Sequence, residues 1–136
     1  MRPAIDRRTA ELALLWCRLK WGKSRYVKGW PRLRCQAWSS KDLYGWYNEQ
    51  LNLITLHMDW HESPLDLVET VIHEYTHYRQ DIAGKYGRLA AEYANLPYEA
   101  HPLEKQAYAR QARWGAQCLE DISKWCSAKT DATIVH

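Results

Sequence analysis

Hydrophobic and polar residues follow two different periods along this chain, and each period predicts its own secondary structure. Residues 6–20 read DRRTAELALLWCRLK, where apolar residues recur at helical spacing at Leu12, Leu15, Trp16 and Leu19. Asp6 precedes them and is a suitable N-cap. These residues predict an N-terminal amphipathic helix.

The next three hydrophobic segments have the features of strands. In residues 32–38 one face carries Leu33, Cys35 and Ala37, and the other carries Arg32, Arg34 and Gln36. This alternation predicts a half-buried strand. Residues 43–47 and 51–58 flank the polar residues 48–50, which predicts a hairpin with a three-residue loop.

A second helix is predicted to begin after Ser63. Ser63 is a good N-cap, Pro64 suits the first helical position, and Asp66 stands where a capping-box acid would. Gly84 marks the expected end. The expected core stripe is Leu65, Val68, Ile72, Tyr75 and Ile82.

A loop around residues 95–102 separates this helix from a longer one, expected over residues 102–127. One face of the longer helix carries Leu103, Ala107, Trp114, Cys118, Ile122 and Trp125. The order helix, small sheet, helix, helix predicts an α+β fold. We expect a sheet of three to four strands and one domain spanning residues 1–136, since 136 residues suit a single core.

The second helix contains the sequence HEYTH, residues 73–77. On a helix, His73 and His77 stand one turn apart, about 5–6 Å between Cβ atoms, so both imidazoles can reach one Zn²⁺. Glu74 lies in the same sector and can reach a metal-bound water. The segment therefore predicts one zinc ion per chain, held by the two histidines.

A catalytic zinc usually has three protein ligands, so a third must come from elsewhere in the chain. We favour Glu104, which lies in the first turn of the long C-terminal helix and can face back to the second helix. Glu99 and His101, on the loop before it, are alternatives. Tyr98 and His101 are also candidates to donate to a developing oxyanion.

The pairing of HEYTH with Glu104-x-x-Ala107 resembles the gluzincin metallopeptidases, which combine HExxH with Glu-x-x-Ala on a downstream helix. The order of elements is similar to that of the minimal gluzincins and the ImmA/IrrE-type metallopeptidases, over roughly residues 43–112. The resemblance implies a zincin-like fold with an active-site helix and a C-terminal glutamate helix. It implies His73, His77 and Glu104 as ligands and Glu74 as general base. Relatives often carry Asp or Asn four residues after the ligand glutamate, where this chain has Tyr108.

Two other histidine patterns point elsewhere. No third histidine follows His77 at the spacing typical of metzincins, and the histidine-rich turn of SprT-like proteases is missing. His57 and His61 repeat the spacing of four residues, but they are expected to span a strand end and a loop. We interpret them as polar loop residues near the cleft.

The charge distribution is uneven. Residues 1–41 carry 11 Lys or Arg against 2 Asp or Glu, whereas residues 42–84 carry 1 against 8. The basic segment also contains Trp16, Trp21, Trp30 and Trp38, a combination that suits nucleic acid. We favour the simpler interpretation, in which Lys and Arg stems cover the solvent face of a sheet.

Neither a run of about 18 apolar residues nor a signal-peptide pattern is found, which predicts no membrane span and a cytoplasmic protein. Cys17, Cys35, Cys118 and Cys126 form no C-x-x-C pair, so we expect reduced and largely buried thiols.

These features predict a zinc-dependent endopeptidase acting on a peptide or protein, with the strand at residues 51–58 pairing with an extended substrate. The alternative is a non-catalytic zincin scaffold whose basic, Trp-rich region binds nucleic acid or a protein partner. The C-terminal His136 is a further candidate to enter the cleft and occupy the metal.

Overall fold

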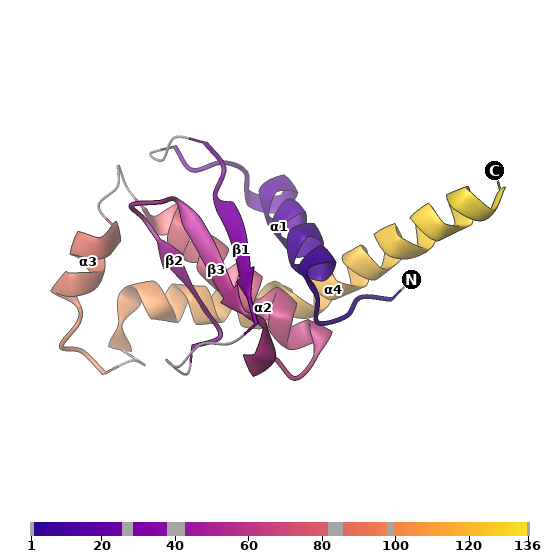
Figure 1. The fold of residues 1–136 in the computed structure, drawn as a ribbon. Helices are drawn as coiled ribbons and strands as arrows, with labels where there is room; N and C mark the ends of the chain where they lie inside the picture. The colour runs from indigo at the N-terminus through magenta and orange to yellow at the C-terminus, as the bar shows by residue number, and fades with distance from the viewer. Residues whose placement is uncertain (1, 26–28, 38–42, 82–85, 98–99, 136) are drawn as a thin grey trace.

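The computed structural model describes residues 2–25, 29–37, 43–81, 86–97 and 100–135. The elements follow the chain in the order α1 (Arg7–Trp21), β1 (Arg32–Gln36), β2 (Gly45–Asn48), β3 (Leu53–His57), the 3-10 turn η1 (Met58–Trp60), α2 (Pro64–Gln80), α3 (Tyr86–Glu92) and α4 (Pro102–Val135) (Figure 1). The predicted α+β fold is thereby confirmed, with a sheet of three strands.

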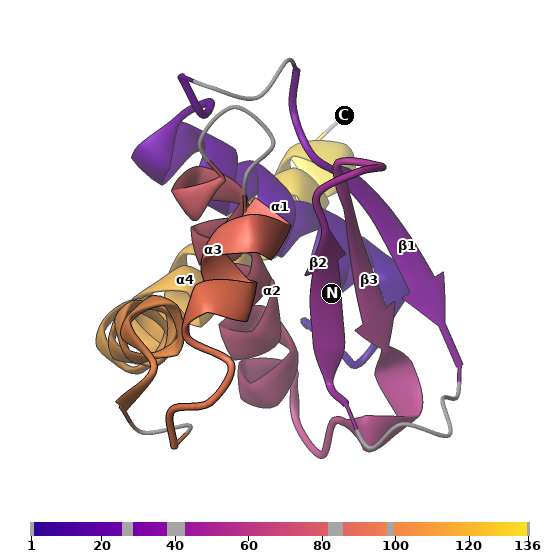
Figure 2. The same ribbon diagram turned by 90° about the vertical axis from the view of Figure 1, so that its left-hand side faces the viewer.

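The elements form layers around α2. Figure 2 shows the sheet on one side of α2 and the glutamate-bearing α4 on the other, with α1 beside them. The core is built where these layers meet, from Ile54 and Leu56 of β3, Val68 and Ile72 of α2, and Cys118 of α4. Because α2 is covered on both sides, polar side chains along it have to find partners within the protein.

The sheet has the order β1-β3-β2, with β1 parallel and β2 antiparallel to β3. Thr55 at the centre of β3 stands opposite Arg34 on one neighbour and Trp46 on the other. The expectation that residues 51–58 pair with a substrate is therefore wrong, because β3 is the central strand and both its edges are already paired. Within the described residues β2 pairs only with β3, and its Tyr47 N–H donates to Glu74 of α2.

Gly45, at the start of β2, lies close to both β3 and α2. A Cβ atom at this position would lie 2.8 Å from the Thr55 carbonyl oxygen and 3.1 Å from the Cγ2 atom of Thr70. A side chain at this position would meet the β3 backbone as well as Thr70 of α2, so the edge strand would have to shift.

The hairpin loop is longer than predicted. The paired strands end at Asn48 and resume at Leu53, so four residues connect them. Asn48 Oδ1 accepts hydrogen bonds from the backbone N–H groups of Gln50 and Leu51, at 3.0 and 3.2 Å, and Asn52 has a φ of 49°. An Asx turn and a left-handed residue thus replace the first two positions of the expected strand.

The Asp6 cap of α1 is confirmed by a 2.9 Å hydrogen bond from the Thr9 N–H, but the expected apolar face is partly wrong. Leu15 and Leu19 are 43% and 70% exposed. The buried face instead comprises Thr9, Ala10, Ala13, Leu14, Trp16 and Cys17. Small residues on this face let α1 pack closely on α2 and α4, a preference that hydrophobicity alone does not reveal.

The Ser63 cap and the position of Pro64 in α2 are confirmed, whereas the Asp66 carboxylate accepts from the Glu62 N–H and not from that of Ser63 as in a capping box. Pro64 occupies the first turn, and Ser63 accepts a 3.1 Å hydrogen bond from the Asp66 N–H. The helix ends at Gln80, and both Gly84 and Ile82 lie outside the described residues. Leu65 is 36% exposed and does not join the buried stripe, because the helix presents its other faces to the sheet and α4.

The C-terminal part of the chain differs from its prediction in two ways. The last helix begins at Pro102 as expected but continues to Val135, so its second half extends beyond the other elements (Figure 1). The seven-residue α3 was not predicted. All four cysteines are free, and no helix among the described residues is long and apolar enough to cross a membrane.

Candidate metal centre

The two histidines of HEYTH lie one turn apart on α2 and face α4. Their rings are 4.9 Å apart between centroids and nearly perpendicular, and both side chains are buried. This arrangement follows from the helix, since side chains at i and i+4 lie on the same face.

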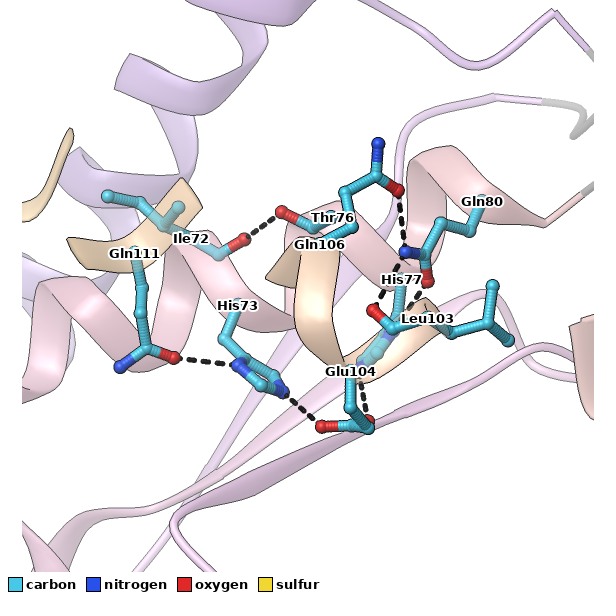
Figure 3. A network of polar contacts seen from close by, with 9 residues as sticks. All are labelled: Ile72, His73, Thr76, His77, Gln80, Leu103, Glu104, Gln106 and Gln111. Carbon is cyan, nitrogen blue, oxygen red and sulfur yellow. Dashed lines mark hydrogen bonds and ion pairs between the residues drawn. The ribbon is translucent and has the colours of Figure 1, made fainter. Parts of the chain in front are cut away.

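Glu104 completes a cluster of three. It lies in the first turn of α4, where its Oε2 atom is 3.0 Å from Nε2 of His73 and its Oε1 atom is 2.7 Å from Nε2 of His77. Figure 3 shows the carboxylate beneath both imidazoles. One donor atom from each of the three residues lies within 4.8 Å of the others. The structure thus brings together the three residues that the sequence singles out as ligands.

The donor set fits a zinc ion. His73 Nδ1 lies 2.7 Å from Gln111 Oε1, and His77 Nδ1 lies 2.7 Å from Gln80 Oε1, so all four ring nitrogens face acceptor oxygens. With a cation at the two Nε2 atoms, each imidazole would keep its Nδ1–H to donate to the facing glutamine oxygen. Donors around tetrahedral zinc stand roughly 3.3 Å apart, which falls between the 2.7 Å contact of His77 with Glu104 and the 4.8 Å within which all three donor atoms lie.

Charges and burial shift the pKa values of two groups at this site. Burial alone would lower the pKa of His73, but the hydrogen bond with Glu104 and the charges of Glu74 and Glu104 raise it overall. Burial raises the pKa of the Glu74 carboxyl, against the charges of both histidines and a hydrogen bond from the Tyr47 N–H. Glu74 is therefore a buried carboxyl group held between the edge strand and the cluster.

A cavity of about 440 Å³ opens beside the cluster. Three segments line this cavity. They are the start of β2 with the two residues before it (Leu43, Tyr44 and Gly45), α2 (Thr70, His73 and Glu74) and α4 (Tyr108 and Gln111). Glu74 and His73 therefore both border a space that a ligand could enter from solvent, under the edge of the sheet.

Sequence reasoning did not single out the two glutamines that orient the imidazoles. Gln80 lies three residues after His77, and Gln111 lies seven residues, or two helical turns, after Glu104. Each offset places the amide on the same helix face as a proposed ligand, which is the signal that could have identified both. Tyr108, at the position where relatives carry Asp or Asn, instead packs its ring edge-on against His73 at 4.7 Å.

The other predicted site residues lie apart from the cluster or outside the described residues. His101 precedes α4, with its ring 5.7 Å from that of Tyr93, and it is not among the residues that line the cavity. Tyr98, Glu99 and His136 lie outside the described residues.

The second histidine pair is buried rather than part of an open loop. His57 Nδ1 donates to the Leu43 carbonyl oxygen at 2.7 Å, and His61 Nε2 lies 2.9 Å from the Thr70 hydroxyl oxygen. Both partners line the cavity, so this pair supports the cavity walls.

The aromatic residues of the basic segment are used mostly in packing. Trp16 and Trp21 meet edge to face at 5.4 Å, and the Trp16 indole donates to Asp121 of α4 at 2.8 Å. Lys20 lies 3.7 Å above the Trp114 ring, which adds a cation–π contact. Trp30 is 40% exposed, and Trp38 lies outside the described residues.

Comparison of the chain with protein-family models, with curated proteins and with solved structures gave no match. Inference about function therefore depends on the geometry of the site.

Proposed function

We propose that this protein is a zinc-dependent endopeptidase of the gluzincin type, built on a zincin-like fold. The observation that supports this most is the convergence of His73, His77 and Glu104 from two helices, next to a buried Glu74 and a cavity. The three residues would hold one zinc ion. When bound, zinc supplies Lewis acidity for the carbonyl group and for water.

The chain's own residues supply the remaining parts of a hydrolytic site. Glu74 lies where its carboxylate can take a proton from water and pass one to the leaving amine. Leu43, Tyr44 and Gly45 line the cavity at the edge of the sheet, so we assign the outer edge of β2 to the substrate backbone. The prediction that Tyr98 or His101 donates to the oxyanion stays a prediction.

Glu74→Gln tests the enzymatic step because it removes the proton acceptor and retains the shape of the side chain. We expect cleavage of a denatured protein substrate to fall by at least about 100-fold, in line with the contribution of general-base catalysis. Bound zinc should stay at the level of the unsubstituted protein. Full cleavage by this variant would show that Glu74 is not the general base.

The alternative function is a non-catalytic binding module, and one feature favours it. The face of the sheet turned away from α2 carries a groove of about 330 Å³, lined by Arg34, Thr55 and Trp46 among others. An arginine and an exposed tryptophan that line the same groove across β3 suit an anionic, stackable ligand such as single-stranded nucleic acid. If this function is the true one, the unsubstituted protein cleaves nothing and Glu74→Gln leaves binding to an oligonucleotide unchanged.

A further inference from the structure

The Gln80 side chain lies between the two segments that carry the proposed zinc ligands. Its Oε1 atom is 2.7 Å from His77 Nδ1, on the same helix. Its Nε2 atom donates to the Leu103 carbonyl oxygen at 3.0 Å and to Gln106 Oε1 at 2.7 Å, both in the first turns of α4 (Figure 3). The Gln80 amide thus contacts α2 through its oxygen atom and α4 through its nitrogen atom.

The contact with Leu103 matters because this residue directly precedes Glu104. A carbonyl group of the helix backbone cannot rotate away, so a hydrogen bond to it fixes the position of the first turn of α4 against α2. The same turn determines where the Glu104 carboxylate meets the two imidazoles. One side chain therefore contacts both the imidazole of His77 and the turn that carries Glu104.

We propose that Gln80 is a positioning residue that couples the imidazole of His77 to the backbone next to Glu104, and so assembles the three-ligand site from two helices. This inference rests on the proposed metal site. It assigns Gln80 a role beyond that of an ordinary hydrogen-bond acceptor for a ligating histidine.

The proposal explains why an amide, rather than a carboxylate, stands at this position. Carboxylates are common partners of ligating histidines, and a glutamate at position 80 would accept from His77 equally well. It could not donate to the Leu103 carbonyl oxygen, however, and would place a negative charge against that oxygen. Gln106 can turn its own amide to compensate, whereas the Leu103 carbonyl cannot. Of glutamine and an ionised glutamate, which share this shape, only glutamine both accepts on one side and donates on the other.

The test is zinc affinity, measured on the full chain by competition with a chromophoric chelator. Gln80→Leu removes both contacts and Gln80→Glu removes only the donor, while Gln106→Ala removes the exposed contact and serves as the matched control. Changes behind a ligating histidine typically weaken metal binding by roughly 10–100-fold. We expect losses in that range for Gln80→Leu and for Gln80→Glu, and less than about threefold for Gln106→Ala.

Two further measurements separate positioning from simple structural support. With Co²⁺ in place of zinc, both Gln80 variants should show altered visible absorption, because the ligand arrangement around the metal changes. In the metal-free protein, backbone amides in residues 103–107 should exchange hydrogen faster in both Gln80 variants than in Gln106→Ala. If Gln80→Leu does not fold, the comparison of Gln80→Glu with Gln106→Ala decides the question in the same way.

Zinc binding by Gln80→Glu as tight as, or tighter than, that of the unsubstituted protein would overturn the proposal, since the acceptor alone would then suffice. These measurements do not involve peptide cleavage. If the expected ranking of affinities is found in a protein that cleaves nothing, the peptidase function fails and the role of Gln80 stands. If the unsubstituted protein binds no zinc, both fail.

Discussion

Two pairs of histidines in this chain have the same spacing, and only one of them forms a cluster with a carboxylate. His73 and His77 bring their Nε2 atoms to Glu104, at 3.0 and 2.7 Å. His57 and His61 are equally buried, yet each binds a different partner, the Leu43 carbonyl oxygen and the Thr70 hydroxyl group.

The difference comes from the backbone. Within α2 a separation of four residues returns the side chain to the same face, about 5–6 Å away. His57 ends β3 and His61 follows η1, so the chain changes direction between them and their rings do not share a face. The Thr70 hydroxyl donates to the Asp66 carbonyl oxygen at 3.0 Å, so it accepts from His61. Spacing therefore identifies a metal site only together with the helix that carries it.

The largest effect should come from removing either histidine of the first pair. Zinc at a thousand times its Kd stabilises a protein by about 4 kcal/mol if only the folded state binds it. We expect His73→Ala and His77→Ala to lose this zinc-dependent increase in unfolding free energy, because only one imidazole and one carboxylate then remain to hold zinc. Urea unfolding with and without zinc measures this increase in the free energy of unfolding.

His57→Ala is the matched control for this prediction, since it removes a buried histidine of the second pair. The zinc-dependent increase should persist in this variant. If it disappears equally in His57→Ala and His77→Ala, the two pairs do not differ in the way that the structure indicates.

Removing the carboxylate should have the next largest effect. Glu104→Ala leaves both histidines in place, so we expect zinc binding to weaken by roughly 100-fold or more rather than vanish. His101→Ala should change zinc affinity by less than about threefold, since His101 lies outside the cluster. Isothermal titration with zinc measures both, and a greater loss in His101→Ala would favour His101 as the third ligand.

The two histidine pairs also show which structural features the sequence predicts. Local signals were reliable: Asp6 and Ser63 cap their helices, and the alternation in β1 sets Arg32 and Arg34 toward solvent with Leu33 and Cys35 half-buried. These features depend on neighbouring residues alone. The same is true of the relation between His73 and His77.

Features that depend on packing between distant elements were less predictable. Leu15 and Leu19 look like core residues but are exposed, because α1 packs through its small residues. The central position of β3 follows from strand order, which no local pattern encodes. The sequence did not indicate Gln80 and Gln111, because their contacts with the other helix depend on how α2 and α4 pack.

The smallest of the predicted effects concerns the second histidine pair. His57→Ala and His61→Ala should each lower the free energy of unfolding by about 1–3 kcal/mol, because each removes a buried imidazole together with its hydrogen bond. Zinc stoichiometry should stay unchanged in both. Urea unfolding of the metal-free proteins measures this loss, and a variant that keeps full stability but loses zinc would place that histidine in the metal site instead.

The central claim is that His73, His77 and Glu104 hold a metal ion, and the metal content of the purified protein tests it most directly. Protein prepared without chelators, then analysed by elemental mass spectrometry, should contain one zinc ion per chain. Protein from which the metal has been removed should take up one equivalent on titration. A protein that contains no zinc and takes none up would contradict the account.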